Sequence, residues 1–374
     1  MKINKLRLIN FRNYSKLDID FNDHLNIIIG NNAQGKTNIL EAIYFLSITK
    51  SFLSNNDGIC INNGQLFFKI FGDIITNDGI KKLSILFNEN GKKLTINDNE
   101  IKKHALYIGN LKVILFNPDN VRLIKDAPGN RRKFLNIEIS QLDNKYINIL
   151  NEYNIVLKQR NEYLKVIKSG KINEVYFDII NEKLVMLAVS IYEYRIKFTE
   201  MINKYITNIF KDISGYDDLV LKYIPSVDIS DISNIGNNIR DKMASSYDRE
   251  VFYGNSLVGP HRDDFSFKLG ENDLVLYGSQ GQLKMAILAL KLAEVNVFKD
   301  MCNEYPVLLL DDLFSELDVN KRNKVINYLN RDIQTIVTTT DLENIEDNLV
   351  KNSYVYKIEN GNVCETIMEG RDNI

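Results

Sequence analysis

The sequence predicts an α/β fold with a mainly helical second lobe inserted into it. A glycine-rich stretch, Gly30 to Thr37, follows a short apolar run typical of a buried strand and precedes a helical pattern. A second apolar run, Val307 to Leu310, is also typical of a buried strand and ends in two adjacent acids. Between them the chain is helical in pattern from about Asn130 to Asp212, with few Gly or Pro. We therefore expect a discontinuous head, residues 1–118 and 282–374, and a helical arm lobe, residues 119–281.

The composition is that of an ordinary globular protein. Of 374 residues, 44% are hydrophobic and 26% charged, and the length is enough for two lobes. No apolar run is long enough to span a bilayer and no signal peptide is evident, so a cytoplasmic protein without membrane segments is expected. The three cysteines are scattered and lie apart from the three histidines, which disfavours a disulfide framework and a structural zinc site. The net charge of -2 neither indicates nor excludes nucleic acid, because local basic patches matter more than the total.

The N-terminal part of the chain is predicted to be rich in strands. Lys2 to Asn10 and Leu17 to Phe21 alternate between apolar and polar residues, and the turn between them carries Arg12. Leu25 to Ile29 is the strand before the glycine-rich stretch, and Thr37 to Leu46 is the helix after it. Further strands are expected at Phe67 to Ile75, Lys82 to Phe87, Lys93 to Ile96 and Val113 to Phe116.

The glycine-rich stretch reads G-x-x-x-x-G-K-T, the pattern of a phosphate-binding loop. Its glycines allow the backbone to turn, so that loop N–H groups and the helix N-terminus converge on a phosphate. Lys36 adds a cation for the β- and γ-phosphates, and the Thr37 hydroxyl can ligate Mg²⁺. A chance match would not bring the correct strand and helix with it. We therefore expect a nucleotide to bind at Gly30, Asn31, Asn32, Ala33, Gln34, Gly35, Lys36, Thr37 and Asn38, with Mg²⁺ at Thr37.

The middle of the chain is predicted to form an antiparallel helical arm. Its best apolar stripe runs from Leu184 to Tyr194, and Ser169-Gly170 is the expected turn at its tip. Strands are expected to return at Leu219 to Ile224, Phe265 to Leu269 and Leu274 to Tyr277.

The two acids after the second buried strand are candidates for metal binding and catalysis. Asp311 can hold the Mg²⁺ of a nucleotide, and Asp312 can orient or deprotonate the attacking water. Alone, such a strand end would be read as a polar turn, but a phosphate-binding loop in the same chain favours the functional interpretation. Downstream, Asp318 could simply cap a helix from Asn320 to Leu329, and Thr335 to Thr340 predicts a strand ending in hydroxyls.

Ser279 to Gln282 opens a further helix and allows two interpretations. Ser279 is a plausible N-cap, and Gln282 at the third position would complete a capping box. The alternative is a second phosphate-recognition element, in which the Ser279 hydroxyl, the Gly281 N–H and the helix N-terminus point at an anion.

The order of these motifs resembles that of ABC-type ATPases, and the N-terminal Asn10-Phe11-Arg12 resembles their SMC-like, DNA-acting branch. Within that branch the chain is similar to the RecF family over essentially its whole length. The matching stretches are Leu8 to Tyr14, Gly30 to Asn38, Pro128 to Arg132, Leu257 to Asp264 and Leu309 to Asp312. Each stretch alone is a weak or moderate signal, but their order along the chain is specific.

The resemblance implies roles for several residues. Ser279, Gly281 and Gln282 would form the signature motif, which in this class contacts the γ-phosphate of ATP held by the other subunit. Asp318 would lie in the loop that crosses the dimer interface, and Arg12 would reach the phosphates. Two departures from the wider pattern predict slow ATP hydrolysis. Asp312 stands where most ABC-type ATPases have Glu, and Thr338 to Thr340 occupies the usual position of a histidine. Asn117 is the nearest candidate for the glutamine loop of this class.

The predicted DNA contacts are Arg131, Arg132 and Lys133, which the family-like P-x-x-R-R stretch favours over other basic pairs. Each basic pair alone is better explained as a solvated charged face. His261 and Arg262 could equally be a buried hydrogen-bonded cluster or part of a site.

The resemblance implies a weak, DNA-associated ATPase that dimerises with ATP and acts in recombinational repair and replication-fork maintenance. It would bind gapped or junction-containing DNA and, with RecR and RecO as partners, help to load recombinase. One alternative is the soluble ATPase subunit of an ABC transporter, against which the N-terminal motif and the long helical insertion argue. Another is a small-molecule kinase, in which Ser279 to Gln282 would have no use.

Overall fold

The computed structural model describes residues 1–170, 173–314, 317–326, 328–329, 332–340, 353–359 and 361–368. The chain forms two compact units. The first comprises Met1–Val121, Asn208–Tyr216 and Lys284–Ile374, and the second comprises Arg122–Thr207 and Asp217–Leu283. Ser315 and Glu316, within the motif that precedes Asp318, lie outside the described residues.

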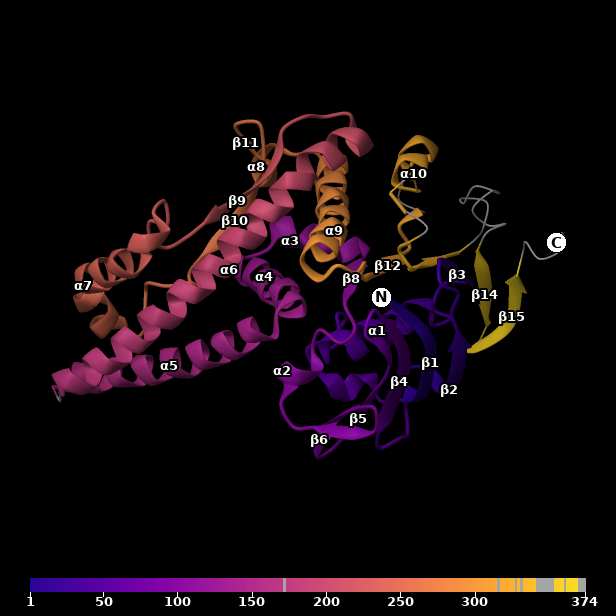
Figure 1. Ribbon diagram of the computed structural model, residues 1–374, viewed down its shortest axis with the longest axis horizontal. Helices are drawn as coiled ribbons and strands as arrows, with labels where there is room; N and C mark the ends of the chain where they lie inside the picture. Colours follow the sequence, from indigo (N-terminus) through magenta and orange to yellow (C-terminus); the bar gives the residue numbers. More distant parts are fainter. Residues whose placement is uncertain are drawn as a thin grey trace. The chain divides into compact units, whose positions relative to one another are not determined.

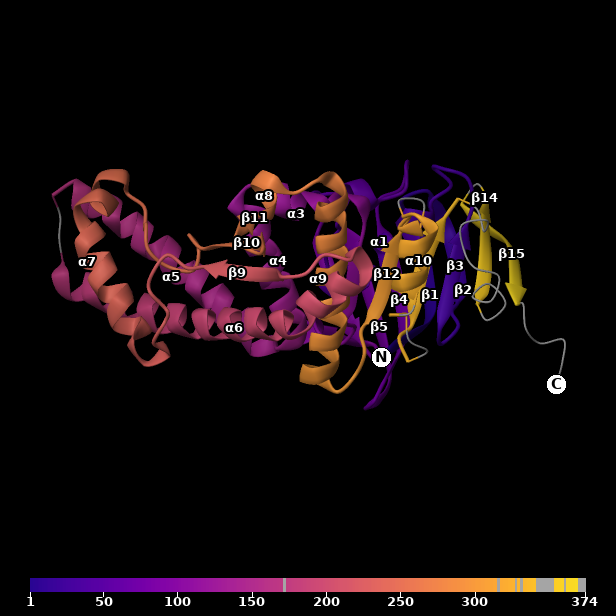
Figure 2. The same ribbon diagram turned by 90° about the horizontal axis from the view of Figure 1, so that it is seen from above.

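A mainly parallel sheet organises the first unit. Its order is β15-β14-β3-β13-β12-β8, and β3, β13, β12, β8 and β14 pair in parallel, whereas β15 is antiparallel to β14. Figure 2 shows β12, β3, β14 and β15 following one another across this unit. The strands are β3 (Leu25–Ile29), β8 (Val113–Phe116), β12 (Val307–Asp311), β13 (Thr335–Thr339), β14 (Tyr354–Glu359) and β15 (Asn362–Met368). Because parallel strands end at the same edge, the segments that follow β3, β12 and β13 meet there.

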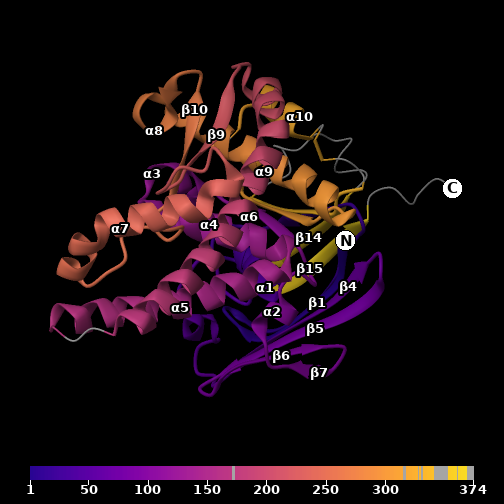
Figure 3. The ribbon, with the colours of Figure 1, turned by 60° about the vertical axis from the view of Figure 1, so that its left-hand side comes forward.

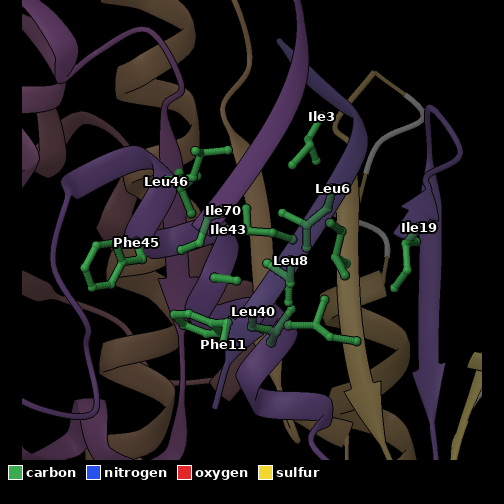
Figure 4. Close-up of a cluster of buried hydrophobic side chains, with 14 of the residues drawn as sticks. Ile3, Leu6, Leu8, Phe11, Ile19, Leu40, Ile43, Phe45, Leu46 and Ile70 are labelled. Atoms are coloured by element: carbon green, nitrogen blue, oxygen red, sulfur yellow. The ribbon is translucent and has the colours of Figure 1, made fainter. Parts of the chain in front are cut away.

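An antiparallel sheet packs on the other side of helix α1 (Lys36–Ile48). Its order is β2-β1-β4-β5-β6-β7, and β5 to β7 form one edge (Figure 3). Along β1, Ile3, Leu6, Leu8 and Phe11 are fully buried and face α1, as Figure 4 shows, while the side chains between them are more exposed. The strands are β1 (Lys2–Phe11), β2 (Tyr14–Asp20), β4 (Phe68–Thr76), β5 (Gly79–Asn88), β6 (Gly91–Ile96) and β7 (Asn99–Ile101).

Short helices complete the first unit. They are η1 (Asp57–Cys60), α2 (His104–Tyr107), η2 (Pro118–Val121) and α10 (Val319–Ile326), and the long α9 (Gln280–Cys302) begins in the second unit and continues into the first. The predicted strands from Lys2 to Phe116 and the helix after the glycine-rich stretch are confirmed, with small shifts at their ends.

The second unit contains the predicted antiparallel arm. Helices α5 (Asn144–Lys168) and α6 (Glu174–Ser214) lie side by side in Figures 1 and 2. The rings of Tyr146 and Tyr194 are 5.2 Å apart, and those of Tyr163 and Phe177 are 5.8 Å apart, so the helices run in opposite directions. The other elements are α3 (Arg122–Lys125), α4 (Pro128–Leu142), η3 (Ile232–Asn234), α7 (Ile235–Tyr253), α8 (Leu274–Tyr277) and a sheet of β11 (Asn272–Asp273), β10 (Asp264–Leu269) and β9 (Leu219–Ile224).

One predicted element is wrong and others were not anticipated. Leu274–Tyr277 is a helical turn rather than a strand, because the Asp273 side chain accepts a hydrogen bond from the Val275 N–H at 2.9 Å and caps it. Helix α7, β14 and β15 were not predicted. The buried Ile235, Ile239 and Met243 of α7 recur four residues apart, so the sequence did carry that signal.

Candidate nucleotide-binding site

A pocket of about 310 Å³ lies where the ends of the parallel strands meet. It brings together most of the glycine-rich loop and both acids at the end of β12. Its lining is Asn32, Ala33, Gln34, Gly35, Lys36, Thr37, Asn38, Pro118, Asp311, Asp312 and Thr338. Gly30 and Asn31 begin the loop but are not among the lining residues. The predicted convergence of the glycine-rich loop with Asp311 and Asp312 is therefore present.

The loop needs glycine at two positions for different reasons. Gly35 has φ +105°, a conformation that side chains other than glycine rarely adopt, and its Cα faces the Asn13 amide. Gly30 lies against the main-chain carbonyl of Ile358 in β14, so an added Cβ would collide with backbone. A side chain at either position would displace the loop from the pocket.

Lys36 is held inside the loop that it follows. Its side chain is buried, and its ammonium donates hydrogen bonds to the carbonyls of Gly30 and Asn31, the latter at 3.0 Å. Burial lowers the pKa of Lys36, while the carboxylates of Asp312 and Asp311 oppose that shift. Because Lys36, Asp311 and Asp312 line the same pocket, they can act on one ligand.

Asp311 and Thr37 form an oxygen-rich corner of the pocket. The Thr37 hydroxyl donates to Asp311 Oδ1 at 2.9 Å, and the Thr338 hydroxyl donates to the same oxygen at 2.7 Å. Burial raises the pKa of Asp311, and these two hydrogen bonds counter it. Hydroxyl and carboxylate oxygens are ligands that Mg²⁺ prefers, so this donor set fits the ion. The side-chain Oδ1 of nearby Asn117, before Pro118, is buried without a hydrogen-bond partner among the described residues.

Thr338 also fixes the backbone of Asp312, a role that the sequence did not reveal. Its hydroxyl oxygen accepts a hydrogen bond from the Asp312 N–H at 3.0 Å. Asp312 has φ +49°, in the left-handed region that is uncommon for residues other than glycine. This single residue of β13 therefore orients both acids.

Arg12 is not among the residues that line the pocket, so its contact with the phosphates stays a prediction. Its guanidinium forms a bidentate pair with Glu41 of α1, at 2.7 and 2.5 Å, and donates to the Ile59 carbonyl. Glu41 is fully buried, and it also accepts a hydrogen bond from Ser51. A buried carboxylate requires such a partner, so in this structure Arg12 compensates the buried charge of Glu41.

The two residues after Arg12 hold the loop directly, and sequence reasoning gave them no role. Asn13 donates to the Gln34 carbonyl at 3.0 Å and accepts from the Asn38 side chain at 2.8 Å. The buried Tyr14 hydroxyl donates to the Gly35 carbonyl at 3.0 Å. The β1–β2 turn therefore holds the phosphate-binding loop in place through hydrogen bonds.

The predicted signature residues do not line this pocket. The Ser279 N–H donates to Gln282 Oε1 at 2.8 Å, and the Gln282 N–H donates to Ser279 Oγ at 3.2 Å, so the capping box is present. Ser279 and Gly281 are exposed. Asp318 is exposed as well and caps α10 by accepting from the Lys321 N–H at 3.0 Å.

The predicted DNA contacts Arg131 and Arg132 form hydrogen bonds within the second unit. Arg131 is buried and forms a bidentate pair with Asp264 at 2.5 and 2.8 Å, while its third nitrogen donates to main-chain carbonyls. The contact of Arg131 with DNA stays a prediction, and in this structure its guanidinium is occupied by Asp264. Arg132 donates to the Asp263 carbonyl at 2.7 Å but remains partly exposed, and Lys133 is exposed.

His261 belongs to a hydrogen-bonded cluster, which resolves the alternatives that the sequence left open for it. Its ring nitrogens lie 2.6 Å from the Tyr153 hydroxyl and 3.1 Å from the Ser256 carbonyl. Burial lowers its pKa to about 4, so the ring is neutral near pH 7.

Comparisons with known proteins agree with this arrangement. Residues 2–363 match the family model described as the RecF/RecN/SMC N terminal domain. The DNA replication and repair protein RecF of Geobacillus sp. (strain WCH70) is 37% identical over 99% of this chain and 100% of that protein. The chain belongs to the RecF family. RecF of Lactobacillus gasseri is 39% identical over 97% of this chain and 99% of its own length.

Solved structures show the same relationship. A structure described as the recombination mediator protein RecF-ATP in the RecFOR pathway matches with a TM-score of 0.89 and 31% identity, covering 98% of this chain and 96% of that one. An Smc head bound to a domain of ScpA matches with a TM-score of 0.56 and 16% identity, which shows a shared fold only. These relatives do not favour the transporter-subunit alternative. Among the described helices, none combines the length and apolarity needed to cross a membrane.

Proposed function

We propose that this protein binds ATP and, in its ATP-bound form, binds DNA during replication and repair. The convergence of Lys36, Thr37 and Asp311 in one pocket is the observation that supports this most strongly. The relatives support it too, because they are named as DNA replication and repair proteins, and a solved relative is described with ATP.

The pocket residues would divide the work on ATP. The loop N–H groups and Lys36 would hold the β- and γ-phosphates, and Asn38 would complete the cradle. Thr37 and Asp311 would hold Mg²⁺, which neutralises charge on the phosphates when bound. Asp312 would orient or deprotonate the attacking water. An aspartate reaches less far than a glutamate, which fits slow hydrolysis used as a switch.

The signature residues would act on a second copy of the chain. Ser279, Gly281 and Gln282, at the end of the arm lobe, would contact the γ-phosphate held by the partner, and Asp318 would lie near the interface. All except the partly exposed Gln282 are exposed, and none lines the pocket of its own chain. ATP would therefore join two copies, and its hydrolysis would release them.

The proposed DNA substrate is gapped or junction-containing DNA, with RecR and RecO as partners in loading recombinase. This part rests on the family and on the pathway named for the solved relative. Arg132 and Lys133 remain candidate contacts to DNA phosphates.

The test is equilibrium binding of purified protein to gapped and continuous duplex DNA with ATP, with ADP and without nucleotide. Affinity should rise with ATP and should be highest for gapped DNA. Lys36→Met should lose the ATP effect. ATP binding without DNA binding in any state would instead favour a membrane or protein partner, as for a transporter subunit.

A further inference from the structure

The turn from Gly259 to Asp264 meets the start of α4 in the second unit, and its two aspartates are already matched by arginines. Asp264 pairs with Arg131 at 2.5 and 2.8 Å. Asp263 is 1% exposed and pairs with the equally buried Arg195 at 3.2 Å. Asp263 also accepts a hydrogen bond from the Ser226 N–H at 2.8 Å and another from the Tyr223 hydroxyl. Each carboxylate therefore already has an arginine as its ion-pair partner.

Two more arginines belong to the same cluster, and main-chain oxygens hold both. Arg132 donates to the Asp263 carbonyl at 2.7 Å. Arg262 donates through Nε and Nη2 to the Ser256 carbonyl, at 3.0 and 2.7 Å. Among the described residues, neither guanidinium forms an ion pair with a carboxylate. A carbonyl takes up a hydrogen bond but cancels no charge, so both positive charges persist.

The two arginines meet at the same turn, because Arg132 donates to the carbonyl of Asp263, the residue that follows Arg262. Burial and Arg195 lower the pKa of Arg132, the two aspartates oppose that shift, and Arg262 adds to it. Both arginines also act to lower the pKa of His261, which lies in the same turn. Because His261 is neutral near pH 7, the surplus charge is carried by Arg132 and Arg262. Repulsion between like charges disfavours this arrangement unless an anion is bound.

The carbonyls that hold the arginines are themselves fixed. Ser256 is 1% exposed, and its N–H and hydroxyl both donate to Asn161 Oδ1, at 2.7 and 2.8 Å. Asp263 is fixed by the pairs described above. Arg262 is nevertheless exposed and Arg132 partly exposed, so their remaining N–H groups can reach a ligand. A guanidinium that is already positioned loses less entropy when it binds.

We propose that Arg132 and Arg262 form a pair that binds backbone phosphates of DNA. This inference rests on the proposed DNA-binding function and names one of its contact points. A guanidinium offers parallel N–H donors that match phosphate oxygens, which suits it to this contact better than an ammonium. Such contacts position a protein on DNA and read no sequence, so the pair should act equally on all sequences.

The test compares R132Q/R262Q with a control that removes the same charge from the same unit, K183Q/R240Q. The control cations Lys183 and Arg240 pair with Glu152 and Glu182, so neither carries an uncompensated positive charge for a phosphate to neutralise. DNA affinity with ATP would be measured over a salt series. Each lost phosphate contact should reduce the slope of log affinity against log salt by about 0.9. If the affinities are equal at about 1 M salt, this smaller slope makes binding at about 0.1 M about eightfold weaker. R132Q/R262Q should therefore lose about 1.8 in slope and bind about 60-fold more weakly, and the control should match wild type.

ATP affinity and thermal unfolding of each variant report whether the fold is intact. If R132Q/R262Q unfolds, R262Q alone should still lower the slope by about 0.9, because Arg262 is the more exposed partner. Wild type that binds DNA, together with R132Q/R262Q that binds like the control, would overturn this inference alone. Wild type that fails to bind DNA at all would overturn the proposed function first.

Discussion

Arg12→Ala separates the two roles that have been assigned to Arg12. The substitution removes the cationic partner of Glu41, which is fully buried and accepts both hydrogen bonds of the bidentate pair. Removing one partner of a buried pair costs about 3–5 kcal/mol, because the remaining charge is left without compensation. Arg12 keeps 16% of its side chain exposed and Glu41 keeps its bond from Ser51, so the lower end, about 3 kcal/mol, is expected.

The assay is urea unfolding without nucleotide, with ATP binding measured in parallel. Arg7→Ala is the matched control, because Arg7 of β1 pairs with Asp18 of β2 but both side chains are well exposed, at 49% and 39%. That control should cost about 1 kcal/mol or less. If the Arg12→Ala variant is as stable as the Arg7→Ala variant but has lost ATP affinity, the structural role of Arg12 is refuted. That result would favour the phosphate contact that the family resemblance implied.

Three further predictions concern the pocket and the signature. Asp311→Asn should weaken the Mg²⁺-dependent part of ATP binding, whereas Asp312→Asn should keep binding and stop hydrolysis; identical behaviour in titration and phosphate-release assays would contradict this division. Asn13→Ala should lower ATP affinity by up to about thirtyfold, since it loses two hydrogen bonds to the loop, each worth about 1 kcal/mol; unchanged affinity by calorimetry would show that these bonds do not contribute to ATP binding. Ser279→Arg should bind ATP normally but stay monomeric in sedimentation, and wild-type dimerisation would leave Ser279 with the capping role alone.

The sequence predicted strands and helices well where the apolar pattern and the turn residues that flank it indicated the same element. Leu25 to Ile29 and Val113 to Phe116 are predicted and observed with the same bounds, because each is a mainly apolar run closed by a polar turn. Leu274 to Tyr277 is also an apolar run, but four residues fit one helical turn as well as a short strand. The choice depended on Asp273, whose side chain caps the turn.

The pairing of charged residues could not be read from the sequence. Arg131 and Arg132 look equivalent in the chain. Arg131 is nevertheless buried and paired with Asp264, 133 positions away, whereas Arg132 donates a hydrogen bond to the main-chain carbonyl of Asp263. Likewise nothing near Arg12 in the chain indicates that Glu41 faces it. Local patterns predict which elements form, whereas partners of this kind depend on how distant strands and helices pack.

The most direct test of the proposed function is whether ATP controls DNA binding and assembly together. Wild-type protein would be examined by analytical ultracentrifugation with fluorescently labelled gapped duplex, in ATP with Mg²⁺ and, separately, in ADP with Mg²⁺. The proposal predicts a dimer on DNA with ATP and mostly free monomer with ADP. Tight DNA binding that is the same in both nucleotides, or no DNA binding in either, would contradict it.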